Sequence, residues 1–412
     1  MVAWIFRSHG TQGINWTFPY FSGAANFRSL YDWQISPEDY DQVKGMTPAE
    51  HGHYRYARAD KTVEYTVNNY GYVLVALAAR NLFFWAGDAH AVVYLQVLVH
   101  VALSLLTLAH LRSRLQRGFF FVLFAINPLI LYFVTFPFYY YWAAVPSLIL
   151  VATVLREQRW GMEVLLLSVL LFVCFLIRPT TLFVSMLIFM VWLRRERKVM
   201  VAAGVAVFCA LAWHSSGHFS TSPWHTMYVG LGAYSNPYGM EGPFDEAGFK
   251  RYTDLTGKAI STHAITGDYS KREVRQDYYA LMRSEYLNVV RESPLGIMRN
   301  AAYNLIQSFG FGYRVSRPVV QLVSGVVGLI MIGLIVWTHQ WMWGVGVLAV
   351  AGSFAPYFPP IPAYLFGAFP FTALAAGGIA ETLWRKRAES SGGRTRSQHS
   401  NERPVPELTR PI

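Results

Sequence analysis

The sequence predicts an all-α protein that crosses a membrane about nine times, and three observations support this. Of its 412 residues, 53% are hydrophobic and only 14% are charged, whereas an ordinary soluble domain is about 25% charged. Nine apolar runs approach the roughly 20 residues that a helix needs to cross a bilayer. Clusters of basic residues occupy alternate connections between these runs. Together these features exclude a soluble globular domain and a disordered chain.

The apolar runs are expected to be transmembrane helices in a six-helix block over 89–216 and a three-helix block over 318–384. They cover residues 89–110, 119–137, 139–155, 162–178, 180–193, 199–216, 318–338, 340–356 and 361–383. Pro137 separates the second run from the third, and Pro179 separates the fourth from the fifth. Proline ends a helix because it lacks a backbone donor and restricts the residue before it.

Charge at the connections predicts the orientation. Basic clusters lie at 112–117, at 156–159, at 194–198 and after 385. The excess of Lys and Arg in cytoplasmic loops places all four inside the cell. They account for most of the net charge of +11, so this charge does not indicate a nucleic-acid partner. We expect an integral protein of a bacterial inner membrane, with a cytoplasmic C-terminus and a disordered basic tail over 385–412.

This topology leaves two large segments on the outer side, 1–88 and 217–317. Within the first, residues 68–87 fit either an amphipathic helix on the membrane surface or a further span. We favour the surface helix, because a span here would reverse the four basic clusters. The N-terminus would lie outside, yet residues 1–67 contain no signal peptide. We therefore expect a tenth, N-terminal helix to precede Met1 in the complete protein.

The acidic residues indicate where chemistry occurs. None of the 24 lies in the middle of a predicted span, whereas ion-coupled transporters carry ionisable groups at that depth. His100 is the one plausible buried titratable group in a span, and we expect it to be a hydrogen-bonded packing residue. Cys174 and Cys209 both lie in apolar runs and suggest neither a disulfide nor a zinc site. The outer face is therefore the expected place for a reaction.

The large outer segment combines aromatic and acidic residues. His225 and Tyr228 precede a turn-rich stretch that ends at Asp245 and Glu246. Aromatic faces stack on sugar rings and polar groups bind sugar hydroxyls, so this stretch suits a carbohydrate. An ordinary turn-rich loop that packs its aromatics on the membrane explains it equally well.

Two helices are expected further along this segment. Val274, Tyr278, Met282, Tyr286 and Val289 recur at helical spacing and make one apolar face. Ser293-Pro294 is typical of a helix start and predicts a second helix toward residue 307. These helices are expected to brace the loop.

In combination, these features resemble the C-type glycosyltransferase superfamily, which includes protein O-mannosyltransferases and lipid A aminoarabinose transferases. Five stretches carry the resemblance: YDWQISPEDY (31–40), GDAHAVVYLQVL (87–98), RPTTLF (178–183), WHTMYVGLGAYSNPYG (224–239) and PPIPAYLFGAFPF (359–371). The resemblance implies a glycosyltransferase of the cell envelope. Its partners would be a polyprenyl-phosphate-linked sugar donor, membrane lipids and a lipid, glycan or protein acceptor.

The resemblance also implies roles for particular residues. A carboxylate in the first outer segment would act as general base on the acceptor hydroxyl, and Asp32 matches best, with Glu38 and Asp39 as second choices. A plain surface aspartate is the alternative for Asp32. This chain lacks the first helix from which the position of the family's acid is measured.

A cation should face the lipid phosphate that leaves. Arg178, at the outer end of a span, is the first candidate, and Arg58 and Lys61 are the second. The alternative for Arg178 is an interfacial arginine that reaches lipid headgroups. Asp245 and Glu246 could bind acceptor hydroxyls or a divalent cation, although no metal-ligand set can be assembled from the sequence. A flippase, a transporter or a polymerase subunit for lipid-linked glycans is the alternative function.

Overall fold

The computed structural model describes residues 14–64, 69–156, 161–216, 222–236, 240, 242–260, 271–312 and 318–396. The protein is 76% helical with almost no strand, as the sequence predicts. Its strands β1 (Gln34–Ile35) and β2 (Val63–Glu64) form a short antiparallel pair in which Gln34 faces Glu64.

The described part of the first predicted outer segment contains four helices: α2 (Ile14–Ala25), α3 (Pro37–Val43), α4 (Pro48–His53) and α5 (Tyr70–Leu82). Local sequence fixes where the short ones begin. The Ser36 hydroxyl accepts a hydrogen bond from the Asp39 backbone N–H at the start of α3. Thr47 and Glu50 form a reciprocal capping box at the start of α4, which satisfies backbone donors that the first helical turn leaves open.

The first predicted membrane block contains the following elements: α6 (Asp88–His110), α7 (Arg114–Phe120), the π-helical turn η1 (Phe121–Ala125), α8 (Pro128–Thr135), the 3₁₀ turn η2 (Tyr139–Ala143), α9 (Ala144–Leu155), α10 (Glu163–Ile177), η3 (Pro179–Thr181), α11 (Leu182–Arg195) and α12 (Lys198–Ser216). The second block contains α17 (Pro318–Trp337), α18 (Trp341–Ala351), α19 (Pro362–Leu365) and α20 (Phe369–Arg396). Each predicted span thus contains helix.

Nine full-length spans are not confirmed. Within the described residues, three helices are long and apolar enough to cross a membrane: α6, α12 and α17. A fourth results if α7 with η1 and α8 count as one span, although they meet at a bend of 47°. The bend follows from Asn127-Pro128, because Pro128 opens α8 and supplies no backbone donor. The other predicted spans are shorter apolar helices, such as α10 with 15 residues.

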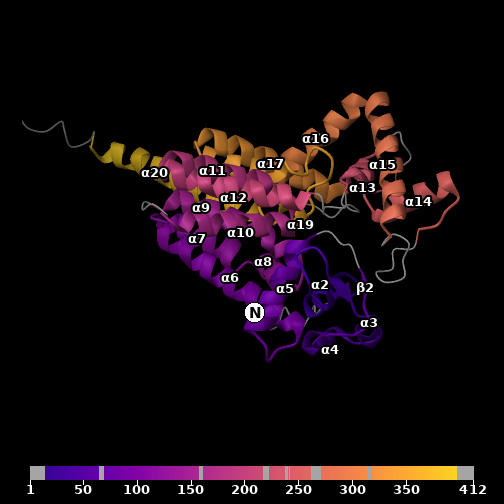
Figure 1. Ribbon diagram of the computed structural model, residues 1–412. Coiled ribbons are helices and arrows are strands. Elements are labelled where there is room, and N and C mark those ends of the chain that lie inside the picture. The colour runs from indigo at the N-terminus through magenta and orange to yellow at the C-terminus, as the bar shows by residue number, and fades with distance from the viewer. Residues whose placement is uncertain are drawn as a thin grey trace, which may run out of the picture.

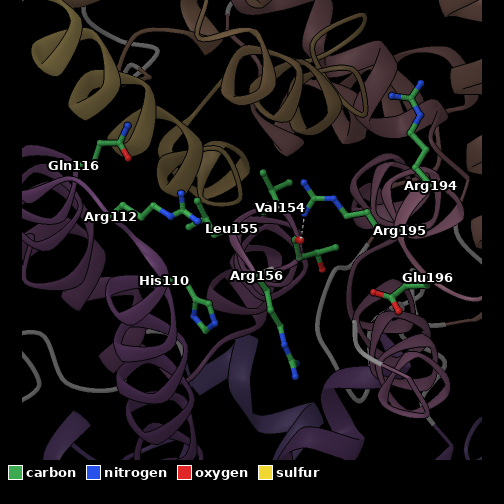
Figure 2. A pocket seen from close by; sticks show the side chains of 10 residues that line it. His110, Arg112, Gln116, Val154, Leu155, Arg156, Arg194, Arg195 and Glu196 are labelled. Carbon is green, nitrogen blue, oxygen red and sulfur yellow. Dashed lines mark hydrogen bonds between the residues drawn. The ribbon is translucent and has the colours of Figure 1, made fainter. Parts of the chain in front are cut away.

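The helices form a bundle with two distinct ends (Figure 1). Both predicted outer segments lie at one end, where α2–α4 and α13–α15 are seen, and α20 leaves the bundle at the other. The three basic connections at 112, 156 and 194–195 line one cavity, although they are far apart in sequence (Figure 2). The shared location agrees with a common side for these connections.

Helix α5 occupies the stretch that we predicted to lie on the membrane surface. It packs against α2, α6 and α10, and one face is buried, including Tyr72 and Ala79. Gly71 permits the close approach to α10, since a Cβ there would lie 2.5 Å from the backbone nitrogen of Ile177. The helix therefore packs one face on the bundle and has 13 residues rather than the length of a span; its position on a membrane surface stays a prediction.

The described part of the C-terminal tail differs from our expectation. We expected disorder from residue 385, but α20 continues to Arg396. Residues 385–389 contain no helix breaker, Arg385 pairs with Glu381 one turn earlier, and the Lys386 ammonium lies 4.2 Å from the centre of the Trp337 ring. These contacts favour continuation of the helix. Residues 397–412 lie outside the described part.

The large outer segment contains α13 (Trp224–Gly230), the 3₁₀ turn η4 (Leu231–Ala233), α14 (Asp245–Thr256), α15 (Arg272–Glu292) and α16 (Pro294–Ser308). The apolar face predicted for 274–289 is confirmed, because Tyr278, Met282 and Tyr286 are buried on α15. The start predicted at Ser293-Pro294 is confirmed as well, with Pro294 in the first turn of α16.

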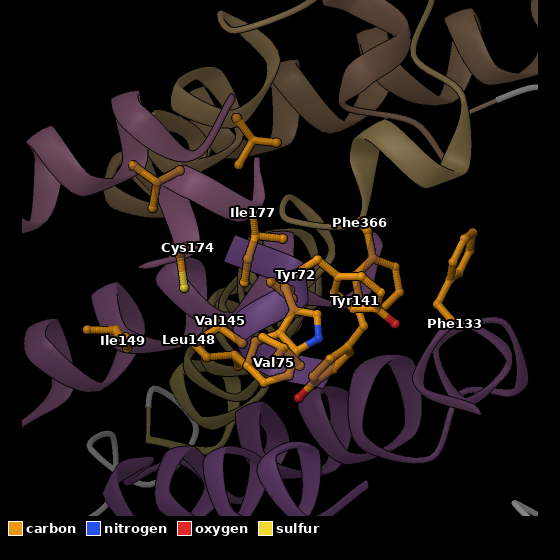
Figure 3. Close-up of a cluster of buried hydrophobic side chains, with 14 of the residues drawn as sticks. Tyr72, Val75, Phe133, Tyr141, Val145, Leu148, Ile149, Cys174, Ile177 and Phe366 are labelled. Carbon is orange, nitrogen blue, oxygen red and sulfur yellow. The ribbon is translucent and has the colours of Figure 1, made fainter. Parts of the chain in front are cut away.

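A continuous apolar core joins the two membrane blocks (Figure 3). Tyr72 of α5, Tyr141 of η2, Ile177 of α10 and Phe366 after α19 come together there. His100 is buried beside this core and bonds the Ala125 carbonyl through Nε2 at 3.0 Å, so it is a hydrogen-bonded packing residue. The core fixes the ends of η2, α10 and α19 relative to one another, and these ends carry the site described next.

Candidate functional site

Arg178 lies in a cage of tyrosines at the end of α10. Its guanidinium carbon is 4.4 Å from the ring centre of Tyr364, 5.4 Å from that of Tyr140 and 5.6 Å from that of Tyr139. One guanidinium nitrogen donates to the Ala363 carbonyl at 3.4 Å. The residue is only 6% exposed, and it forms no ion pair with a carboxylate of the described chain. We call Arg178 with these three tyrosines the arginine cage.

The local sequence explains the cage. Pro179 ends α10 immediately after Arg178, so this side chain leaves the helix at its last turn. Tyr139 and Tyr140 belong to the 3₁₀ turn that leads into α9, and Tyr364 belongs to the one-turn helix α19. Cation–π contacts partly replace the water that a buried guanidinium loses. The burial of a cation without a counter-ion still has a cost, which a bound anion would offset.

A row of three hydrogen-bonded side chains lies in the large outer segment and consists of Asp245, His225 and Tyr278. His225 of α13 bonds the Asp245 carboxylate through Nε2 at 3.0 Å and the Tyr278 hydroxyl through Nδ1 at 2.5 Å. The bond from His225 holds the pKa of Asp245 below its usual range, so this carboxylate is ionised at neutral pH. The Asp245 side chain is 74% exposed and can therefore reach a ligand.

The row lies near the cage. Asp245 is within electrostatic range of both Tyr140 and Tyr364 of the cage. Helix α13 approaches the chain next to the cage closely, because a Cβ on Gly230 would lie 2.0 Å from the Tyr357 carbonyl oxygen. Arg178 and Asp245, both selected from the sequence, therefore lie in one region, and His225 joins Asp245 to Tyr278 beside it.

The candidate acids of the first outer segment do not contact the arginine cage within the described residues. Asp32 and Glu38 are exposed, and Glu38 accepts a hydrogen bond from Ser36 at 3.0 Å. Trp33, next to Asp32, packs on Tyr20, and Tyr20 packs on Tyr139 of the cage. The structure thus places Asp32 near the same end as the cage but brings none of Asp32, Glu38 and Asp39 into contact with Arg178 within the described residues.

Asp39 belongs to a buried polar cluster. Only 2% of it is exposed, and it accepts hydrogen bonds from the Tyr54 hydroxyl at 2.6 Å and the Ala57 backbone N–H at 3.2 Å. Burial and the hydrogen bond to Asp39 raise the pKa of Tyr54, so its hydroxyl remains a donor. These bonds hold the chain after α4 against α3.

Sequence reasoning missed the second half of this cluster. Asp88, at the start of α6, accepts a hydrogen bond from the Tyr56 backbone N–H at 2.8 Å and pairs with Arg80 at 2.7 Å. The Asp88 side chain is 4% exposed and that of Arg80 is 18% exposed. The apolar surroundings of Arg80 were the available signal, since a buried arginine needs a partner.

His51 of this cluster gives a prediction for pH dependence. Burial lowers the pKa of His51 to about 4, while histidine in an unfolded chain titrates near 6.5. The unfolded chain binds the proton more tightly between these values, so stability falls as pH drops from about 7 to 4, by up to about 3 kcal/mol. Denaturant unfolding of His51→Gln should show a flatter pH profile than wild type. His339→Gln, at an exposed position, should keep the wild-type slope; equal profiles for all three proteins would contradict this.

The remaining candidates lie apart from the cage or support it. Arg58, Lys61 and Glu246 are exposed. Tyr228 is buried in the apolar cluster that joins α13, α14 and α15, so it serves the packing of the outer segment. Within the described residues, no group of three or more His, Cys, Asp or Glu could hold a metal ion, and the divalent cation stays a prediction from the sequence.

The tyrosines of the cage are the other residues that sequence reasoning missed. The signal for Tyr139 and Tyr140 was the run YYYW at 139–142, at the start of a predicted span, and Tyr364 lies in the stretch at 359–371. Comparison with known proteins adds no further residues: no family model, curated protein or solved structure matches this chain.

Proposed function

We propose that this protein is a membrane glycosyltransferase that moves a sugar from a polyprenyl-phosphate donor to an acceptor hydroxyl at the outer face of the membrane. The observation that carries the proposal is that the His225–Asp245 pair lies near the arginine cage. One side offers a buried cation for a phosphate, and the other offers an ionised, exposed carboxylate for a hydroxyl.

The proposed reaction assigns each group a task. Asp245 accepts the proton of the acceptor hydroxyl, whose oxygen forms a bond to the anomeric carbon of the sugar. The bond between that carbon and the phosphate oxygen breaks, and the electron pair leaves with the polyprenyl phosphate. Arg178 stabilises the charge that grows on this phosphate. His225 holds the carboxylate in position and Tyr278 in turn orients His225.

The proposal includes the nine-span topology that the sequence predicts. Both large segments lie at the end of the bundle opposite the cavity of the basic connections, which supports an outer site and a cytoplasmic C-terminus. The resemblance to C-type glycosyltransferases, carried by stretches such as RPTTLF (178–183), supports a polyprenyl-phosphate-linked sugar as the donor. A flippase or polymerase subunit for lipid-linked glycans is the second candidate, because a phosphate-binding cage also suits a carrier of lipid phosphates.

A transfer assay separates these functions. The purified protein is placed in proteoliposomes with a radiolabelled polyprenyl-phosphate sugar, and transfer to extracted envelope lipids and glycans is measured. Labelled product supports the transferase. If the labelled lipid-linked sugar moves to the other leaflet of the membrane and no product forms, the protein is a flippase and not a transferase.

Asp245 and Asp32 are the two carboxylates to compare in this assay. We expect Asp245→Asn to lower the rate of transfer about 100-fold, since general-base catalysis contributes about 10²–10⁴-fold. Asp254→Asn, an exposed acid on the same helix α14, should retain the wild-type rate. If Asp32→Asn loses activity and Asp245→Asn retains it, the base lies in the first outer segment and our assignment is wrong.

A further inference from the structure

A cavity of about 670 Å³ lies at the end of the bundle away from the arginine cage (Figure 2). Four of the residues that line it are arginines, Arg112, Arg156, Arg194 and Arg195, and one is an acid, Glu196. The helices α6, α9 and α11 all end here, at His110, Leu155 and Arg195. Positive charge is thus concentrated in a hollow rather than spread over a surface.

Helix ends account for part of this charge. The Arg195 guanidinium donates to the carbonyls of Thr153 and Val154, both at 2.8 Å, in the last turn of α9. Arg156 pairs with Glu163 at 2.9 Å. Cations are favourable at helix C-termini, whose carbonyls lack partners. These two arginines therefore have structural roles.

Arg112 and Arg194 are also exposed at the cavity. They come from connections on either side of α9, and Figure 2 shows them on opposite sides of the α9 end. Among the described residues, the four arginines of the cavity outnumber the two carboxylates beside them, Glu196 in the lining and Glu163 paired with Arg156, so the cavity keeps an excess of positive charge. An anion between the arginines would balance this excess, and the planar guanidinium fork matches phosphate oxygens in particular.

We propose that this cavity binds a phosphate oxyanion, supplied by the headgroup of an anionic membrane lipid. The volume fits a headgroup, since ligand pockets measure about 300–1,000 Å³. Basic pockets at the cytoplasmic ends of helices attract anionic lipid headgroups, and the apolar Val154 and Leu155 also line the cavity. The site is separate from the sugar-transfer site, and it rests on the proposed topology only for the choice of a lipid over soluble phosphate.

Thermal unfolding of the detergent-solubilised full chain tests this proposal. Phosphatidylglycerol, phosphatidylcholine or inorganic phosphate is titrated in turn, and an apparent Kd is obtained from the rise in unfolding temperature. We expect phosphatidylglycerol to stabilise the wild type and phosphatidylcholine to have no effect. The double variant Arg112→Gln/Arg194→Gln should bind phosphatidylglycerol about tenfold more weakly or worse. The matched control Arg291→Gln/Arg299→Gln removes two exposed arginines from α15 and α16 and should bind like the wild type.

The comparison of phosphatidylglycerol with inorganic phosphate shows whether the cavity binds a lipid headgroup or a soluble anion. Inorganic phosphate that stabilises the wild type and not the Arg112/Arg194 variant supports an oxyanion site with a soluble ligand. Equal lipid responses of the two double variants and the wild type overturn the proposal and leave the arginines with capping and orientation only. Native mass spectrometry of retained phosphatidylglycerol gives a second readout that does not depend on the stability of the variants. Because it needs no sugar donor, this experiment fails or succeeds independently of the transfer assay.

Discussion

Replacement of Arg178 by alanine is expected to lower the rate of sugar transfer about 100-fold or more, because the removal of one preorganised donor to a developing oxyanion costs about 10²–10³ in rate. The guanidinium is buried and held by three aromatic rings, so its position does not change when the phosphate gains charge. Kinetics in proteoliposomes would measure the loss. Arg178→Lys keeps the charge but loses the planar fork, and we expect an intermediate rate.

The loss of rate is measured at equal amounts of folded protein. Arg178 has no acidic partner within the described chain, so its removal leaves no carboxylate unpaired, but it empties the space between three rings and removes the donor to the Ala363 carbonyl, which lowers the unfolding temperature. Arg291→Ala, an exposed change on α15, is the matched control for activity. If Arg178→Ala transfers sugar at the wild-type rate, the residue is an interfacial arginine and the phosphate binds elsewhere.

Replacement of Arg80 by alanine is expected to destabilise the protein by about 3–5 kcal/mol, because it leaves the buried carboxylate of Asp88 without its cation. Asp88 would keep the backbone donor of Tyr56 and the electrostatic influence of Arg55. Chemical unfolding in detergent micelles measures the change. Lys44→Ala breaks an ion pair with Asp41 in which both side chains are more than half exposed, and this control should lower stability far less than Arg80→Ala.

A double substitution checks the cause of the Arg80 effect. Arg80→Ala combined with Asp88→Asn removes both charges, so the loss should be smaller than the sum of the two single losses. Additive losses would show that the two side chains act independently, and the pair would then not be the source of the stability.

The sequence predicted those parts of the fold that depend on local patterns. The apolar spacing on α15 and the start of α16 at Ser293-Pro294 are set by neighbours within one or two turns, and both are confirmed. The length of α20 was underestimated, because the contact of Lys386 with Trp337 joins residues that are distant in sequence.

The site was less predictable for the same physical reason. Arg178, His225 and Asp245 could be selected by residue type, but the cage depends on the packing of η2, α10 and α19, and no local signal places Tyr364 beside Tyr139. Nothing in the local sequence distinguishes the three acids of α3, which are Glu38, Asp39 and Asp41. Only the fold of residues 54–57 over α3 buries Asp39 and leaves the other two exposed.

The shortness of several apolar helices has a consequence for the surrounding lipid. Helix α10 has 15 residues and α11 has 14, so each is about 21–23 Å long at 1.5 Å per residue, against a hydrocarbon thickness of about 30 Å. In the proposed topology, lipids beside these helices must compress to match them. A thinned bilayer next to the Arg178 end would bring a long-chain donor's headgroup down to the protein and shorten the path by which it enters from the side.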